Sequence, residues 1–190
     1  MRKIIKAVLV ALVLAFVSAS AWADDDAEAV QLFKNAGQSN AFFAKSYGYA
    51  IFPTVGKAGL VVGGARGEGH VYVKGKPIGS TKVTQLSVGL QAGGQAYSEI
   101  IFFQDKRSLD EFTSGNFEFG AGVNAIAITA SAGASTGTAG SGAGASGGKN
   151  DAATAGAFHK GMAVFTIAKG GLMYEASVSG QKFSFEPNGK

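Results

Sequence analysis

The stretch "GLVVGGARGEGHVYV", residues 59–73, sets glycines among apolar residues and includes Arg66, Glu68 and His70. A phosphate-binding glycine loop leads into a helix N-terminus, whereas this stretch continues into the β-type residues VYVKG. Glycines inside a strand mark bulges, sharp coiling or the close approach of another backbone. The stretch therefore predicts two adjoining β segments of a tightly curved sheet, with Arg66 and Glu68 near the turn.

The same β pattern continues on both sides of this stretch, with β-branched and aromatic residues punctuated by glycine. The segments that carry it are YAIFP, KAGLVVGGA, GHVYVKG, KPIGSTKV, TQLSVGLQAGG, QAYSEIIFFQ, NFEFGAGVNAIAITA, GMAVFTIAKGG, LMYEASVSG and QKFSFEP. Closely spaced strands joined by Gly-Gly and Ser-Gly turn signals favour antiparallel pairing.

Two helices are expected beside these strands. Residues 24–46 begin with three aspartates, and a helical spacing follows, with a break expected near Gly37. The residues at this spacing are Val30, Phe33, Gly37, Ala41 and Ala44. Asp105 precedes a short helical stretch that places Leu109 and Phe112 on one side. The sequence therefore predicts an α+β fold, a strongly curved, mostly antiparallel β-sheet or barrel-like core with an N-terminal helix and a mid-chain helix.

The chain divides into a leader and one domain. Residues 1–23 have a basic start, an apolar run and the small-residue sequence Ala21-Trp22-Ala23, which is the layout of a secretory signal peptide. Residues 24–190 fit a single domain. Within it, residues 131–148 are all Ala, Gly, Ser or Thr, so we expect a flexible loop over 131–150. The chain is expected to be exported, and to be periplasmic or envelope-associated.

Charge argues against nucleic acid as a partner. The whole chain has 17 Lys and Arg against 13 Asp and Glu, but three of the basic residues lie in the predicted leader. The remaining domain is nearly neutral, whereas nucleic-acid binding requires a clear basic excess. The chain also has no cysteine, which excludes disulfides and an N-terminal lipid anchor on cysteine.

Catalytic, cofactor and metal sites are not expected. The glycine motif GAGASG lies inside the Ala/Gly/Ser run and has no strand-to-helix turn around it. His70 and His159 have no companion at metal-ligand spacing. No nucleophile elbow is present, and nothing local pairs Glu68 with Glu99. We therefore expect no enzyme activity, no cofactor and no metal.

Basic side chains distributed along the β region are the remaining candidates for a binding site. They are Lys57, Arg66, Lys74, Lys76 and Lys82. If they converge at one end of the sheet they would bind anionic lipid head groups, and otherwise they form a solvated face. The turn Lys74-Gly75-Lys76-Pro77 is the best local candidate.

Three segments together resemble the SYLF-domain family. They are "YGYAIFPTVGKAGLVVGGARGEGHVYV", "VTQLSVGLQAGGQAYSEIIFFQDKRSLDEF" and "KGMAVFTIAKGGLMYEASVSGQKF", and they cover roughly residues 30–187 in the order typical of the family. The resemblance implies a lipid-binding module with no established catalytic activity and no cofactor. The chain departs from the family in its acidic start DDDAE, where a basic membrane-inserting helix precedes the domain in other members.

These observations favour a non-enzymatic periplasmic binding protein that associates with lipid or membrane and engages anionic head groups or acyl chains. Neither nucleic acid nor actin is expected as a partner. Two alternatives stay open, a small outer-membrane β-barrel and a structural or stress-related envelope protein that binds another protein. Apolar runs without alternation, such as MAVFTIA, argue against the first alternative.

Overall fold

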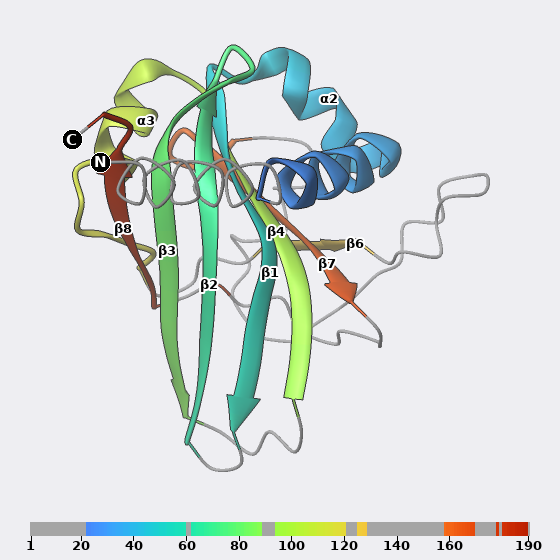
Figure 1. The fold of residues 1–190 in the computed structure, drawn as a ribbon, viewed down its shortest axis with the longest axis vertical. Helices are drawn as coiled ribbons and strands as arrows, with labels where there is room; N and C mark the ends of the chain where they lie inside the picture. The colour runs from blue at the N-terminus through green and yellow to red at the C-terminus, as the bar shows by residue number, and fades with distance from the viewer. Residues whose placement is uncertain are drawn as a thin grey trace, which may run out of the picture.

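One curved sheet organises the molecule (Figure 1). The computed structural model describes residues 22–59, 62–88, 94–120, 125–128, 158–169, 178 and 180–189. The predicted loop over 131–150 and all but the last two residues of the predicted leader lie outside these ranges.

The sheet has eight strands in the order β5-β8-β3-β2-β1-β4-β7-β6. The strands are β1 (Gly48–Gly59), β2 (Val62–Val73), β3 (Lys76–Val88), β4 (Gly94–Phe103), β5 (Phe117–Glu118), β6 (Ile126–Ile128), β7 (Met162–Lys169) and β8 (Gln181–Pro187). All neighbours are antiparallel except β6 and β7, which run parallel. The predicted α+β class with a mostly antiparallel sheet is confirmed.

Pro53 explains the glycines of β2. This proline lies within β1, which pairs with β2 on one side and β4 on the other, and its missing N–H cannot serve a regular ladder. The register shifts beside it, between Ile51 and Thr54 on the β2 side. A Cβ on Gly69 would collide with the carbonyl oxygen of Ile51, and one on Gly67 would lie 2.9 Å from that of Thr54. The two glycines therefore admit the bulge of β1.

Arg66 and Glu68 are not near a turn, contrary to expectation. β2 runs without interruption from Val62 to Val73, so both residues lie in mid-strand. β2 accommodates the close approach of β1 while it stays hydrogen-bonded to that strand, so β2 does not end there.

The sheet curls strongly enough to bring distant strands together. Three strands separate β4 from β8, so a flat sheet would hold them about 19 Å apart. Nonetheless, the Nε2 of Gln181 on β8 donates to the Oε2 of Glu99 on β4 at 2.9 Å. The sheet is therefore a half-barrel, and the face that carries Glu99 and Gln181 is its concave face.

Separate apolar clusters cover the two faces. On the convex face, a helix over residues 22–35 and α2 (Gly37–Lys45) pack with Ile51, Ile100 and Phe165. On the concave face, Phe52, Phe103, Phe112 and Phe183 belong to a second cluster. Because β7 supplies residues to both clusters, its sequence MAVFTIAK is apolar without alternation. β1–β4 extend beyond the helices at one end (Figure 1).

The N-terminal helix breaks where expected and buries Phe33 as expected, but after the break it buries other residues than expected. The break is at Ala36, and the Oγ of Ser39 donates to the carbonyl oxygen of Phe33 at 2.6 Å across it. Phe42 is buried, whereas Ala41 is exposed. The break changes the helical phase, so the spacing that starts at Val30 does not continue into α2.

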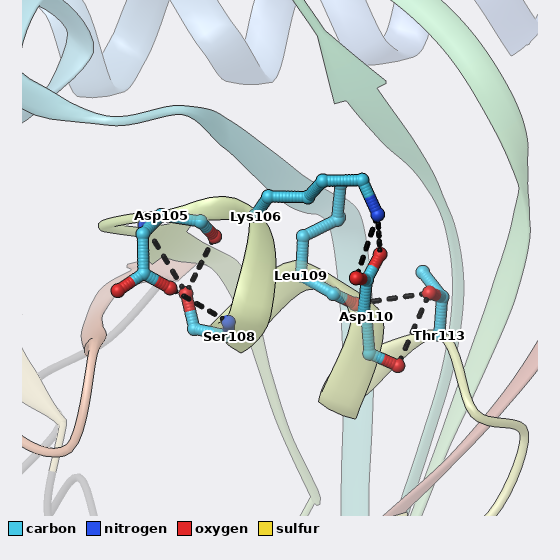
Figure 2. A network of polar contacts seen from close by, with 6 residues as sticks. All are labelled: Asp105, Lys106, Ser108, Leu109, Asp110 and Thr113. Carbon is cyan, nitrogen blue, oxygen red and sulfur yellow. Dashed lines mark hydrogen bonds and ion pairs between the residues drawn. The ribbon is translucent and has the colours of Figure 1, made fainter.

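Helix α3 (Lys106–Phe112) begins with the predicted cap (Figure 2). The Asp105 carboxylate accepts from the Ser108 N–H at 2.8 Å, and the Asp105 N–H donates back to the Ser108 hydroxyl at 3.3 Å. The hydrogen bond from Ser108 is the main reason that the pKa of Asp105 lies below its usual value. Leu109 and Phe112 are buried against the concave face, as predicted.

Two predicted strands are reduced or fall outside the described residues. The segment NFEFGAGVNAIAITA forms the short strands β5 and β6. Most of LMYEASVSG lies outside the described ranges, which resume at Val178 and Gly180. Within the described ranges, no helix combines the length and hydropathy needed to cross a bilayer.

Candidate functional site

The structure separates the five predicted basic residues instead of gathering them. Lys74 and Lys76 lie at the turn between β2 and β3, where Lys74 has a φ of 50°. Arg66 and Lys82 project from the convex face, because their neighbours Ala65 and Val83 face the concave interior. Lys57 pairs in register with Ala65 and is half-buried on the concave side. The five residues therefore form no single patch.

Among these basic residues, Arg66 and Lys82 differ in their pairing. Lys82 Nζ lies 3.8 Å from Glu68 Oε1, its cross-strand neighbour. Lys182, on the same convex face, is likewise 3.5 Å from Glu118. Arg66 is exposed and forms no ion pair or hydrogen bond within the described residues. Its guanidinium is thus available to an external anion.

Leu86 lies beside Arg66 on the convex face. It is 84% exposed, the largest exposure among the large apolar side chains of the described residues. Its cross-strand neighbour on β2 is Gly64, which offers no side chain to cover it, and the next outward pair is Arg66 with Thr84. We call Arg66, Thr84 and Leu86 the Arg66–Leu86 surface. It lies toward the end of the sheet where β2 begins and β3 ends.

A polar network attaches the N-terminal helix to the convex face. Asp26 Oδ2 accepts from the Tyr72 hydroxyl at 2.7 Å and lies 2.7 Å from His70 Nδ1. The Asp26 side chain is only 4% exposed. The hydrogen bond to Asp26 is the largest cause of the raised pKa of His70, and burial opposes it. Burial is the main cause that raises the pKa of Tyr72.

A pocket of about 300 Å³ adjoins this network. It is lined by Trp22, Asp25, Asp26, Pro53, Thr54, Glu68, Gly69 and His70. Trp22 lies 5.7 Å from His70 between ring centroids, although it belongs to the predicted leader. Within the described residues, no three His, Cys, Asp or Glu side chains are grouped so that they could hold a metal ion.

A second buried polar cluster lies on the concave face and is not fully partnered. Gln181 Nε2 donates to Glu99 Oε2 at 2.9 Å and to the Tyr97 hydroxyl at 3.3 Å. Glu99 and Gln181 are both completely buried. Burial raises the pKa of Glu99 to about 7, against the smaller opposing effect of the hydrogen bond from Gln181. Burial also raises the pKa of Tyr97.

Three buried oxygens of this cluster have no hydrogen-bond partner among the described residues: Glu99 Oε1, Thr166 Oγ1 and Gln181 Oε1. Thr166 is the register partner of Glu99, and both face the concave interior. An unpaired buried polar atom costs about 1–3 kcal/mol, so three in one place are an unusual concentration. We call Glu99, Thr166 and Gln181 the concave oxygen cluster.

Sequence reasoning missed both networks, although part of each had a signal. In QKFSFEP, Gln181 alternates with Lys182 and shares the inward face of Phe183, which marks it as a buried polar residue. Glu99 holds the same inward position in AYSEIIFF. Because Glu68 projects from the convex face, these two glutamates do not form a carboxylate pair. The contact between Asp26 and His70 spans 44 positions and has no local signal.

Comparison with known proteins assigns the chain to a family. The family model Ysc84, described as "Las17-binding protein actin regulator", matches residues 84–188, more than half of the chain. The matched region includes the whole concave oxygen cluster but not Asp26 or His70. We keep the prediction that actin is not a partner of this chain.

A curated relative is also similar. Beta cell expansion factor A from Aeromonas veronii is 29% identical over 160 residues, which cover 83% of this chain and 53% of the relative. The chain thus spans about half the length of the curated relative that it matches. SYLF domains are binding domains and are not known as enzymes, which agrees with the absence of a catalytic motif in the sequence. This chain belongs to the Ysc84 family of SYLF-domain proteins.

Proposed function

We propose that this protein is an exported, non-enzymatic binding protein that docks on membranes containing anionic lipids through the Arg66–Leu86 surface. The observation that carries the proposal is the unpaired Arg66 beside the exposed Leu86. The lipid association implied by the SYLF resemblance supports the choice of a membrane as the partner. The predicted leader supports the exported location.

The chemistry of the surface suits the interface of a bilayer. An apolar side chain of leucine size gains about 1.5–3 kcal/mol when it leaves water. A guanidinium binds lipid phosphate through directional charge-assisted hydrogen bonds. Each basic residue near an anionic surface adds about 1 kcal/mol. One leucine and one arginine therefore support weak, salt-sensitive docking and not deep insertion.

The other basic residues fit this role less well. Lys82 is already paired with Glu68. Lys74 and Lys76 are exposed at the other end of β2 and β3, and neither lies beside Leu86. Lys57 faces the concave interior and is half-buried. Of the five candidates from the sequence, Arg66 is the one that we retain for membrane contact.

Vesicle co-sedimentation of the protein purified from the exported fraction tests this function. Vesicles of phosphatidylglycerol and phosphatidylcholine should sediment the protein at low salt, and pure phosphatidylcholine vesicles should sediment it much less. Arg66→Gln and Leu86→Gln should each reduce the bound fraction, by about fivefold for the lost arginine. Amino-terminal sequencing of the same material should begin at Asp24.

Matched controls separate the surface from general charge and apolarity. Lys45→Gln removes an exposed charge on α2, and Leu32→Gln removes an apolar side chain that is 40% exposed on the helix. Neither substitution should change sedimentation. Equal binding by the Arg66→Gln/Leu86→Gln double variant and the unaltered protein would refute the membrane surface. Loss of binding in a Lys74→Gln/Lys76→Gln variant would instead assign it to the β2–β3 turn.

A further inference from the structure

The three residues that carry the unpaired oxygens come from three strands and are neighbours on the concave face. Glu99 on β4 is in hydrogen-bond contact with Gln181 on β8. Thr166 on β7 is the direct cross-strand neighbour of Glu99, so their Cβ atoms are about 5 Å apart on one face. A carboxylate oxygen, a carboxamide oxygen and a hydroxyl oxygen thus share one interior position.

The chemistry of these oxygens defines the missing partner. When Glu99 is ionised, its free oxygen and the carboxamide oxygen of Gln181 both accept hydrogen bonds and do not donate them. Their partner must therefore supply at least two donors, and a positive charge on it would compensate the buried carboxylate. We propose that Glu99, Thr166 and Gln181 bind the primary ammonium group of an amine ligand. Its three N–H donors match the three unpaired oxygens in number.

The described side chains around Glu99 do not supply the positive charge that would compensate its carboxylate. Tyr97 on β4 and Lys57 on β1 are the other titratable side chains that the described strands turn toward the concave face. Tyr97 carries no positive charge, and Lys57 forms no ion pair with Glu99. Within the described residues, Glu99 forms no ion pair at all. The raised pKa of Glu99 agrees with a buried carboxyl group that lacks a positive neighbour.

A route to the cluster follows β4. Alternation turns Gln95, Tyr97 and Glu99 toward the same face, and Gln95 is exposed. The backbone distance from Gln95 to Glu99 is about 14 Å, and the Tyr97 ring, 4% exposed, stands between them. An ammonium group on a short chain can span this distance when Tyr97 moves aside. The site lies on the opposite face from the Arg66–Leu86 surface, so neither proposal depends on the other.

A carboxyl-carbon NMR titration of Glu99 tests the proposal with ethylammonium chloride as the probe. An N–H donor cation should lower the pH at which Glu99 titrates, because it favours the ionised carboxylate. Tetramethylammonium chloride at equal ionic strength has no N–H and should leave this pH unchanged. Ethylammonium should also raise the melting temperature at pH 8, and Glu99→Gln should weaken its binding at least about tenfold.

Two threonine substitutions provide a matched pair. Thr166→Val removes an unpaired hydroxyl on the concave face and should weaken ethylammonium binding by about threefold or more. Thr81→Val removes a hydroxyl on the same face that already donates to the Ser184 carbonyl oxygen at 2.7 Å, and should leave binding unchanged. The same Glu99 titration in both salts, or ethylammonium binding that persists in Glu99→Gln, would overturn the proposal and leave a buried water as the partner.

The ammonium group could come from a free amine or from an aminolipid head group, and vesicles distinguish these sources. Vesicles of phosphatidylethanolamine in phosphatidylcholine carry a primary ammonium, whereas pure phosphatidylcholine carries a quaternary one. A shift of the Glu99 titration with the first vesicles and not the second would assign the site to an aminolipid. A shift with ethylammonium and with neither vesicle would assign it to a free amine.

Discussion

In the described part of the chain, one carboxyl group is buried on each face of the sheet, and the two differ in how they are partnered. Asp26 on the convex side receives two hydrogen bonds on one oxygen, from Tyr72 and His70. Glu99 on the concave side receives one from Gln181, and its second oxygen has none. Both side chains are nearly or completely removed from solvent.

The difference separates a carboxyl group with an ionisable partner from one that has no such partner within the described residues. Asp26 joins a helix to the sheet and has an ionisable partner within hydrogen-bond distance. Glu99 joins two distant strands of the half-barrel but bears the full desolvation of a carboxyl group. The second oxygen of Glu99 has no partner within the described residues, and the amine ligand proposed above would supply one.

The largest expected effect comes from Glu99→Gln. Because the pKa of Glu99 is raised to about 7 when folded, the folded state binds a proton more tightly than the unfolded state does. The free energy of unfolding should therefore fall by roughly 3 kcal/mol as pH rises from about 4.5 to 7, and change little above 7. Glu99→Gln should remove this loss and make the protein more stable at pH 8.

Urea denaturation at pH 4.5 and pH 8 measures this effect. Ser98→Ala is the control on the same strand, since the Ser98 hydroxyl donates to the Pro53 carbonyl oxygen on the other face. Its cost should be nearly equal at the two pH values. If the Glu99→Gln protein loses as much stability from pH 4.5 to pH 8 as the unaltered protein does, Glu99 is not the source of the pH dependence.

The second largest effect should come from Asp26→Asn. The substitution removes the charge that His70 and Tyr72 surround, and should cost about 2 kcal/mol in the free energy of unfolding. Asp25→Asn, next to it but exposed, should cost much less. Urea denaturation of the two variants at pH 6 makes the comparison. Equal stabilities would mean that the apolar cluster around Phe33, and not Asp26, holds the helix in place.

Sequence patterns predicted more of the fold than of the candidate sites. Alternation and glycine placement predicted the strands and their curvature, because these follow from backbone geometry that each short segment carries by itself. The Asp105 cap is local in the same sense, and it is confirmed. Asp26 with His70, and Glu99 with Gln181, are 44 and 82 positions apart, so their meeting depends on how the whole sheet curls. No short pattern contains that information.

The smallest expected effect is the pH dependence of the contact between Asp26 and His70. The raised pKa of His70 means that its stabilising contribution is complete below about pH 6.5 and is lost as pH rises through the folded pKa. His70→Gln should therefore cost more at pH 6 than at pH 9, by about 1 kcal/mol or less, since the ring is partly exposed to solvent. Measuring the difference in a Glu99→Gln background removes the larger titration on the concave face, which also lowers stability as pH rises, and sites that share no partner should contribute independently. His159→Gln serves as the control for loss of a histidine, and proton NMR should place the His70 midpoint above 6.5. A midpoint at or below that value would show that Asp26 holds His70 without favouring its charged form, so that this convex network works through hydrogen bonds alone.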